Sequence, residues 1–459
     1  MATGFGRRRA DASTRGRCGS DEAGKNDACI DMDEDTIFAV ATGAGRAAIA
    51  VMRISGPVSA ATLVALTGSV PPPRRAVLRR LRDQAGDCLD HAVVLWLPGP
   101  GNYTGEDAAE LHLHGGWAVM AGVAECLAAL GLRPAEPGEF TRRAFLNGRM
   151  DLVEAEAVHD LVAAETDAQR RQALRQLDGE LGAMYRGWSD RLRTVLAEQE
   201  ALIDFPDEDL PPEIEAASQR ELMALRTELA AHLDDRHRGE KLREGLFFAI
   251  TGAPNVGKSS LINALARRDV AIVSPIPGTT RDALETRVVF GGVPVTLVDT
   301  AGLRETADVI EAEGVRRARA RAAEADLVIE VVEAGRAAPN HCGAALRVAN
   351  KCDLGGAGPE GALRVSALTG DGMDTLRNRL SAIAREMTQA SGPPPLTQVR
   401  HRSALEAALS HLDRAMRADL PELRSEDLRL ALRSFGRVTG HVGVEDILDT
   451  LFARFCIGK

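Results

Sequence analysis

The sequence lacks the cysteine patterns that mark disulfide frameworks and zinc sites. Its seven cysteines stand at positions 18, 29, 88, 126, 342, 352 and 456, and no two of them form a CxxC pair. Disulfide bonds and a zinc ion are therefore not expected, and this cysteine usage fits a reducing cytoplasm best.

Long apolar runs are also missing. No segment reaches the roughly eighteen apolar residues that a membrane-spanning helix needs, so we expect no membrane contact through a span. The first 32 residues are rich in Gly, Arg and Ser and contain no apolar stretch like that of a secretory signal. We expect residues 1–32 to form a disordered tail.

An excess of positive charge is absent as well. Lys and Arg number 56 against 66 Asp and Glu, which gives a net charge of −10. Such a chain does not hold nucleic acid by its overall charge, so any RNA would need a local basic patch or a basic partner. A length of 459 residues with 45% hydrophobic and 27% charged residues indicates a folded chain of about three domains.

The order of secondary structure predicts a multidomain protein. Short apolar runs bounded by Gly, followed by a helical stretch, predict an α+β domain over residues 33–150. Apolar residues then keep a helical spacing from 174 to 196 and from 222 to 233, and a further helical region begins near Arg400. Strands and helices alternate over 245–385, so we expect an α/β domain inserted into a helical domain formed by 151–244 and 390–459.

The stretch "FFAITGAPNVGKSSLINAL" has the form of a phosphate-binding loop. An apolar strand leads into GxxxxGKS and a helix follows. The glycines allow backbone N–H groups to face phosphate oxygens, the lysine reaches the terminal phosphates, and the serine binds Mg²⁺. The residues expected to bind the nucleotide here are Asn255, Val256, Gly257, Lys258, Ser259 and Ser260.

The stretch "VANKCDL" predicts which base is read. Asn350, Lys351 and Asp353 form NKxD after an apolar strand, and the Asp353 carboxylate can accept two hydrogen bonds from guanine that adenine cannot offer. In "VSAL", Ser366 and Ala367 stand where a backbone N–H would meet the guanine carbonyl. Together with the phosphate loop, this pattern predicts GTP.

The stretch "LVDTAGL" completes the γ-phosphate end of the site. It places Asp299 near Mg²⁺ and turns the Gly302 N–H toward the phosphate, with Thr300 and Ala301 between them. Many GTPases have a glutamine next to orient the attacking water, but this chain has Leu303. No arginine is placed as a finger, and the residues leave the water-orienting acid open among Glu305, Asp308, Glu311 and Glu313.

These motifs, with "GTTRD", "GEFTRRAFLNGR" and the terminal "FCIGK", resemble the MnmE (TrmE) family of tRNA-modification GTPases over residues 36–459. The resemblance implies a folate-binding-like α+β N-terminal domain, a helical central domain and an inserted α/β P-loop GTPase domain. It also implies a K⁺ ion in place of an arginine finger, held by Asn255, Ser274, Ile276 and Thr279.

The resemblance assigns further residues. Ser259 and Thr280 would bind Mg²⁺, and Glu311 would position the water. 5-Formyltetrahydrofolate, or a related one-carbon donor, would contact Arg53, Glu110, Arg149 and Lys459. An arginine at 149 departs from the lysine expected in the family, and its planar guanidinium changes the geometry there.

The resemblance also implies partners and a reaction. Family members are homodimers through the folate domain and form a heterotetramer with an FAD-dependent protein of the MnmG (GidA) type. Together they add an aminomethyl or carboxymethylaminomethyl group to C5 of the wobble uridine of certain tRNAs. The alternative is a regulatory GTPase that serves as a ribosome-assembly or scaffold switch without substrate chemistry. A ribosome-assembly factor usually carries an RNA-binding module with a basic surface, and the sequence shows no such module. A scaffold role leaves "GEFTRRAFLNGR" and the terminal thiol unexplained.

Cys456 stands close to the end of the chain. The run before it is helical in period, so the tail can dock on the helical domain with one apolar side formed by Val444, Ile447, Leu448, Leu451, Phe452 and Phe455. If Lys459 touches folate, Cys456 lies at the edge of that pocket and serves as a nucleophile, acid or base. The alternatives are a small buried hydrophobic residue or a thiol without a role. His112 and His114 share a strand face without further ligands and are expected to be structural or to line a substrate.

Overall fold

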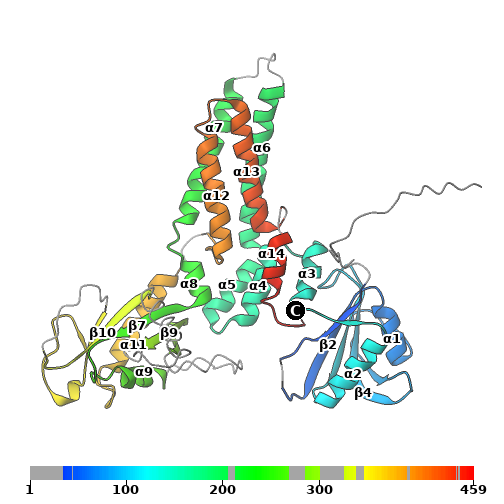
Figure 1. Cartoon of the computed structure of the whole chain (residues 1–459), viewed down its shortest axis with the longest axis horizontal. Coiled ribbons are helices and arrows are strands. Elements are labelled where there is room, and N and C mark those ends of the chain that lie inside the picture. The colour runs from blue at the N-terminus through cyan, green and yellow to red at the C-terminus, as the bar shows by residue number, and fades with distance from the viewer. Residues whose placement is uncertain are drawn as a thin grey trace, which may run out of the picture.

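The structure is a computed structural model that describes residues 35–43, 45–204, 212–267, 285–299, 325–336, 346–389, 393–440, 442 and 445–458. A helical bundle stands upright, with an α/β domain on one side of its base and an α+β domain on the other (Figure 1). The multidomain fold class predicted from the sequence is confirmed. Among the described helices, none is both long and apolar enough to cross a bilayer.

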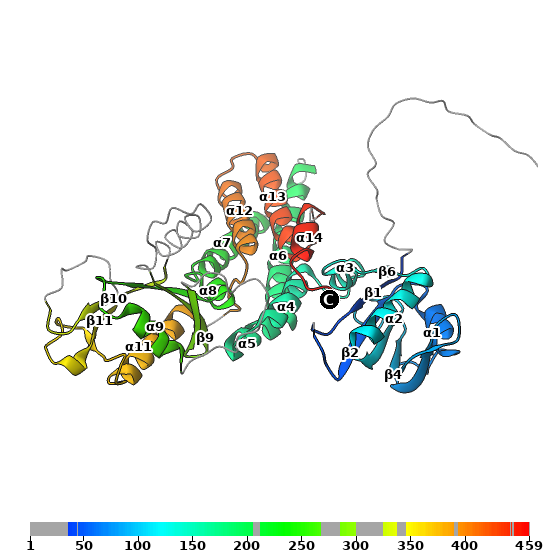
Figure 2. The ribbon, with the colours of Figure 1, turned by 60° about the horizontal axis from the view of Figure 1, so that its bottom comes forward.

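The α+β domain is built on a six-stranded sheet of order β3-β4-β5-β2-β1-β6, antiparallel except for the β1–β6 pair. Helices α1 and α2 share one apolar cluster with the sheet, and Figure 2 shows both helices beside its strands. The elements are β1 (Ile37–Val40), β2 (Ile49–Ser55), α1 (Ser59–Thr67), β3 (Val77–Arg82), β4 (Cys88–Leu97), β5 (Ala108–His114), α2 (Trp117–Ala129), β6 (Arg133–Pro134) and α3 (Glu139–Leu146).

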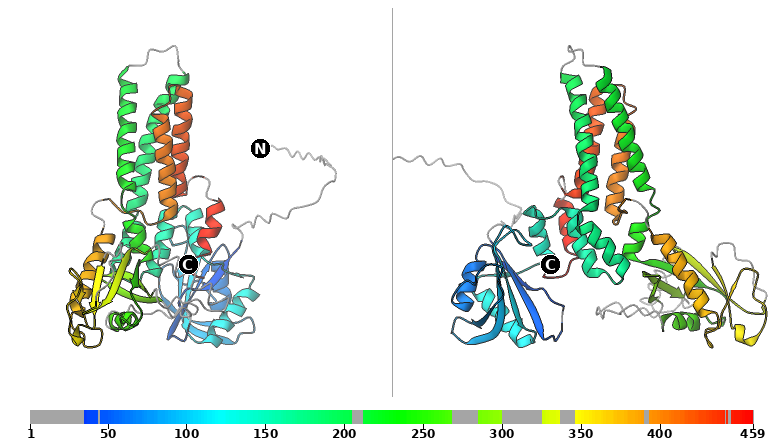
Figure 3. Two further views of the ribbon diagram at one scale, coloured as in Figure 1. Left: turned by 60° about the vertical axis from the view of Figure 1, so that its left-hand side comes forward. Right: turned by 180° about the vertical axis from the view of Figure 1, so that it is seen from behind.

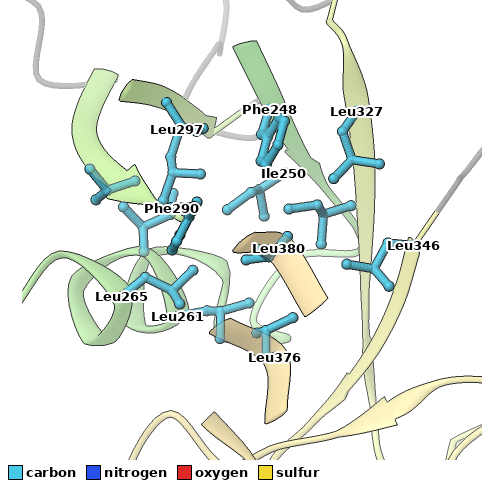
Figure 4. Close-up of a cluster of buried hydrophobic side chains, with 14 of the residues drawn as sticks. Phe248, Ile250, Leu261, Leu265, Phe290, Leu297, Leu327, Leu346, Leu376 and Leu380 are labelled. Carbon is cyan, nitrogen blue, oxygen red and sulfur yellow. The ribbon is translucent and has the colours of Figure 1, made fainter. Parts of the chain in front are cut away.

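The α/β domain has a second six-stranded sheet, of order β12-β11-β10-β7-β9-β8, in which only β8 is antiparallel. Its inner strands β7, β9 and β10 are mostly buried and largely apolar, as expected for a sheet that is covered on both faces. Side chains of α9 and α11 meet those of β7 in one core (Figure 4). The elements are β7 (Leu246–Thr251), α9 (Lys258–Ala266), β8 (Glu285–Phe290), β9 (Val293–Asp299), β10 (Leu327–Glu333), β11 (Leu346–Asn350), η1 (Cys352–Leu354), β12 (Leu363–Arg364) and α11 (Met373–Thr388).

The helical domain comes from both sides of the α/β domain in the sequence. Helices α6, α7, α12 and α13 form a four-helix bundle in which each packs on two others around a common leucine-rich core. The two views of Figure 3 show the shorter helices gathered at the base of the bundle. The helices are α4 (Leu152–Ala163), α5 (Asp167–Leu177), α6 (Glu180–Asp204), α7 (Pro212–Leu233), α8 (Arg238–Glu244), α12 (Val399–Ala415), α13 (Pro421–Thr439) and α14 (Glu445–Phe452).

The helical spacing over 174–196 belongs to two helices rather than one continuous helix. Helix α5 ends at Leu177 and α6 begins at Glu180. Gly179 between them has a φ of +81°, a left-handed conformation that ends a helix and that favours glycine. Apolar spacing alone does not reveal this break, because the residues on either side still face the core.

A buried charge cluster joins α4 to α12 and to the end of α13. The Arg400 Nη2 atom lies 2.7 Å and the His401 Nε2 atom 2.8 Å from Oε2 of Glu156. Arg400 also donates to the carbonyls of Arg437 and Val438, each at 3.1 Å. Burial by itself raises the pKa of Glu156, but the charges and hydrogen bonds of His401 and Arg400 outweigh it and lower the pKa to about 2.

We expect Glu156→Gln to lower the free energy of unfolding by roughly 3–5 kcal/mol, because it leaves the buried His401 and the half-buried Arg400 guanidinium without the carboxylate that they share. Urea unfolding near neutral pH measures this loss. The matched control is Glu221→Gln, which removes a partly exposed ion pair to Arg191 and should cost less than about 1 kcal/mol. Equal losses in the two variants would contradict a structural role for the cluster.

The pH dependence of stability follows from the same carboxylate. Its folded pKa of about 2 lies below the 4.5 of an unperturbed glutamate, so the folded state favours the charged form. The stabilisation from Glu156 is therefore complete above pH 4.5 and is lost as the pH falls toward 2. Unfolding of the wild type should show this acid loss, and unfolding of Glu156→Gln should show less of it.

Candidate functional site

The phosphate loop connects β7 to α9, and its glycines are required by close contacts. A Cβ on Gly252, which has a φ of +141°, would lie 2.2 Å from the Val331 carbonyl oxygen. A Cβ on Gly257, at a φ of +91°, would lie 2.4 Å from Nδ2 of Asn350. The buried Lys258 ammonium donates to the carbonyls of Gly252 and Ala253 at 3.0 and 2.9 Å. The loop is thus shaped to surround phosphate groups and to carry one positive charge.

Two of the oxygens expected around Mg²⁺ lie side by side. The Ser259 hydroxyl donates to Oδ2 of Asp299 at 2.9 Å, which joins the start of α9 to the end of β9. A hydroxyl and a carboxylate are ligands that suit Mg²⁺ bound to a nucleoside triphosphate. The arrangement therefore fits the ion at this edge of the sheet.

Asn350, at the start of the NKxD motif, bonds to the phosphate loop and to the loop after β12, so its side chain connects the three parts of the predicted guanine site. Its Nδ2 atom donates to the Val256 carbonyl at 2.9 Å, and its Oδ1 atom accepts from the Ala367 N–H at 3.1 Å. The side chain is buried, so it acts as a tie between the phosphate loop and the loop after β12. The Lys351 Nζ atom lies 3.4 Å from Oε1 of Glu333, whereas the Asp353 side chain is exposed in η1. Ala367, predicted to meet guanine, donates to Asn350 here.

The remaining predicted residues of the GTP and ion sites divide into two groups. Asn255 lies exposed in the loop with a φ of +63°, Ser260 is exposed in the first turn of α9, and Ser366 is fully buried next to Ala367. The others lie outside the described residues: Ser274, Ile276, Thr279, Thr280, Thr300, Ala301, Gly302 and Glu311.

A second candidate site lies in the α+β domain. Arg53 and Glu110 are paired positions on β2 and β5, and their side chains form an ion pair of 3.1 Å between Nη2 and Oε1. The Arg53 guanidinium also lies 5.4 Å from the ring centre of Tyr103 and 5.7 Å from that of Phe140. Arg149 donates through Nε to the Asn102 carbonyl at 3.1 Å, beside Tyr103 in sequence. Charged groups with flat rings suit a planar ligand that carries carboxylates.

Sequence reasoning missed Arg143, the charged residue behind this site. Its side chain is only 2% exposed and contacts Glu106 and Glu139 at 3.1 Å each. Burial raises the pKa of Glu139, but hydrogen bonds from Arg133 and from the Glu136 N–H outweigh it and lower the pKa. The available signal was an arginine on the same helical face as Phe140 and Ala144, which are both fully buried.

The C-terminal tail is docked between the α+β domain and the helical domain. Leu448, Phe452 and Phe455 pack against Leu152 and Ala155 of α4. The burial of these three tail residues confirms that the tail docks through its predicted apolar side. Leu451, which is half-buried, packs against the same cluster. The side chains of Val444 and Ile447 and the position of Lys459 lie outside the described residues.

Two further contacts fix the tail beyond α14. The Gly138 N–H donates to the Cys456 carbonyl at 3.4 Å, and a Cβ on Gly458 would lie 2.4 Å from the Val40 carbonyl oxygen of β1. Cys456 itself is exposed, so the alternative of a small buried hydrophobic residue is wrong. The docked backbone presents the thiol to solvent at the border of the α+β domain.

The two histidines of β5 contact carboxylates. The Nδ1 atom of His114 lies 2.7 Å from Oδ1 of Asp90, and the Nε2 atom of His112 lies 3.4 Å from Oε2 of Glu110. Within the described ranges, no three histidines, cysteines or acids are grouped so that they could hold a metal ion. The contacts agree with a structural role for His114, while His112 borders the Arg53 site through Glu110.

Together these features define the class of protein. A phosphate loop follows the central strand β7, an aspartate ends β9, and NKxD begins at the end of β11. This arrangement on a largely parallel sheet is that of a P-loop GTPase. Here the GTPase domain is inserted into a helical domain that also carries an α+β domain.

Comparison with known proteins gives the family. The model described as MnmE helical domain matches residues 152–456, and that described as GTP-binding protein TrmE N-terminus matches 36–149. The tRNA modification GTPase MnmE of Gluconacetobacter diazotrophicus is 61% identical over 430 residues, which cover 92% of this chain and 98% of that protein. The protein of the same name from Granulibacter bethesdensis is 57% identical, with 93% and 100% covered. The chain belongs to the MnmE family of tRNA modification GTPases.

We expect Asn350→Ala to weaken GTP and GDP binding by roughly 10- to 100-fold, since it removes both bonds that tie the loops and leaves the Val256 carbonyl and the Ala367 N–H unpaired. Titration with a fluorescent guanine nucleotide measures the change. Cys352→Ser is the matched control in the same motif and should bind as the wild type does. Unchanged affinity of Asn350→Ala would show that the loops hold their shape without this tie.

Proposed function

We propose that the protein is a K⁺-activated GTPase that acts with an FAD-dependent partner of the MnmG (GidA) type. The pair adds an aminomethyl or carboxymethylaminomethyl group to C5 of the wobble uridine of certain tRNAs. Relatives at 55–61% identity bear the name tRNA modification GTPase, which supports the coarser part of this proposal.

One observation carries the finer part: the tail with Cys456 borders the candidate ligand site of the α+β domain. Gly138, which donates to the Cys456 carbonyl, precedes Phe140 by two residues, and the Phe140 ring packs against Arg53. Gly458 touches β1, whose partner strand β2 carries Arg53. A switch without substrate chemistry has no use for a thiol held beside such a site.

In the GTPase domain, the residues present fit the phosphates and Mg²⁺. Lys258 would contact the terminal phosphates, Ser259 and Thr280 would bind Mg²⁺, and Glu311 would orient the attacking water in place of the missing glutamine at Leu303. When bound, K⁺ supplies the positive charge that an arginine finger supplies elsewhere. The proposed K⁺ ligands are Asn255, Ser274, Ile276 and Thr279.

In the α+β domain, Arg53, Glu110, Arg149 and Lys459 would hold 5-formyltetrahydrofolate or a related one-carbon donor. The ion pair and the two rings at Arg53 fit a flat ring system with carboxylates. The domain would also form the homodimer, and the dimer would assemble with its flavoprotein partner into a heterotetramer. Cys456 would add to C6 of uridine and make C5 nucleophilic toward the one-carbon unit, or would act as an acid or base.

GTP hydrolysis should be much faster in K⁺ than in Na⁺, because a ring of oxygens sized for the larger ion fits the smaller one poorly. Steady-state rates in matched K⁺ and Na⁺ buffers test this, and equal rates would contradict it. Asn255→Ala should keep nucleotide affinity and lose the activation. Asn255→Gly is the control for backbone strain. Glycine accepts the φ of +63° without strain and, like alanine, lacks the side-chain amide, so it should lose the activation in the same way.

Cys456→Ser should abolish tRNA modification while GTP hydrolysis and fold stay intact, because serine lacks a nucleophilic thiolate. The measurement is mass spectrometry of wobble-uridine nucleosides from cells that express only the variant. Cys352→Ser is the control and should modify tRNA fully. Full modification by Cys456→Ser would remove the thiol from the reaction, and unchanged nucleosides in cells lacking the protein altogether would overturn the proposed function itself.

A further inference from the structure

Helices α6 and α13 pack side by side in the bundle (Figures 1 and 3). A groove runs between them. It encloses about 400 Å³ and is called the α6–α13 groove below. Ser189 and Gly436 are among the small residues that line it, and one end is lined by Thr439, the last residue of α13, and by Val442, three residues before α14 begins. The groove therefore ends close to the helix that carries the docked tail.

Arginine dominates the charge of this groove. Arg186 and Arg193 line it from α6, and Arg433 lines it from α13. Arg437 is exposed one turn further along α13, toward the tail. Asp190 is the only acid among the described residues of the lining, which include three arginines, in a chain whose net charge is −10. The groove is the kind of local basic patch that this acidic chain needs in order to contact RNA.

Two carboxylates at the groove, those of Asp190 and Asp151, are already engaged. Asp190 pairs with Arg193, and Asp151 pairs with Arg186 at 2.6 Å. Higher on the bundle, Arg429 pairs with Glu200 at 2.8 Å and with Glu426 at 3.4 Å. Among the described residues, neither Arg433 nor Arg437 has a hydrogen-bond or ion-pair partner for its side chain. Two guanidinium groups are thus available to an external anion.

The spacing of these two groups fits a nucleic acid strand. Four residues along an α-helix span about 6 Å, close to the separation of successive phosphates in a single strand. Guanidinium groups present planar forks of N–H donors that match phosphate oxygens. An acidic protein surface would also be attracted to these guanidinium groups, and the test below distinguishes it from RNA.

We propose that the α6–α13 groove binds the phosphate backbone of tRNA and holds the substrate beside the tail that carries Cys456. This inference rests on the proposed function and names the surface of the chain that serves it. Arg433 and Arg437 are the primary contacts, and Arg186 and Arg193 extend the positive surface on α6. Contacts of this type position the RNA without reading its sequence.

The test is binding of an unmodified, fluorescently labelled tRNA transcript to the full-length protein, alone and with its flavoprotein partner, over a series of KCl concentrations. The variant is Arg433→Glu/Arg437→Glu. The matched control is Arg220→Glu/Arg417→Glu, which makes the same change in net charge at two exposed arginines on α7 and after α12. GTP hydrolysis by both variants should equal that of the wild type and reports that they fold.

The groove variant should bind tRNA at least about 10-fold more weakly, and its slope of log K against log salt should be smaller by roughly 1 to 2, the change expected for two lost phosphate contacts. The control should keep affinity and slope. Wild-type binding by the groove variant overturns the proposal, and so does an equal loss in the control, which would mean diffuse charge attraction.

Two further results would also overturn it. Loss of flavoprotein binding with tRNA binding unchanged would make the groove a protein interface. In cells, tRNA modification that requires the protein but is normal in the Arg433→Glu/Arg437→Glu variant would overturn the proposed role of the groove. It would leave the proposed function intact. Modification that does not depend on the protein at all would overturn both.

Discussion

The arrangement of the whole chain depends on the buried carboxylate of Glu156. It lies on α4, the first helix after the α+β domain, and it binds Arg400 and His401 of α12. Arg400 in turn holds the last carbonyls of α13, the helix that leads into the tail. One charge cluster therefore fixes both the point where the chain leaves the α+β domain and the point where it returns to it.

Helix α4 also contacts the GTPase side of the molecule. One turn after Glu156, Asp160 pairs with Arg243 of α8 at 2.8 Å, and α8 leads directly into β7. Burial raises the pKa of Asp160 to about 6 although Arg243 opposes this. Between them, His159 lies against the ring of Phe455 in the tail, with ring centres 4.9 Å apart. A single helix thus touches the bundle, the helix that leads into the GTPase domain and the segment that carries Cys456.

The sequence predicted those features that depend on local backbone chemistry. The phosphate loop could be predicted because Gly252 and Gly257 are required by contacts within a short motif. The docking of α14 could be predicted because its apolar residues repeat with a helical period. The role of Asn350 was only partly foreseen: its motif predicts a guanine contact, and the structure adds a tie between loops far apart in the chain.

Other features could not be predicted because nothing local marks them. Glu156 and Arg400 are 244 residues apart, and each alone reads as an ordinary charged residue of a helix. Strand β3 was missed because half of its residues are exposed and three of them are arginines, as suits an edge strand. The break at Gly179 was missed because the apolar period continues across it.

The central claim is that the tail is seated against α4 and the α+β domain and so holds Cys456 in place. Amide hydrogen exchange of the full-length protein, followed by mass spectrometry of its peptides, tests this directly. The docked tail predicts slow exchange across Leu448–Phe455, closer to that of α13 than to that of a free peptide. Exchange of this segment at the rate of an unstructured peptide, while the bundle stays protected, would contradict it.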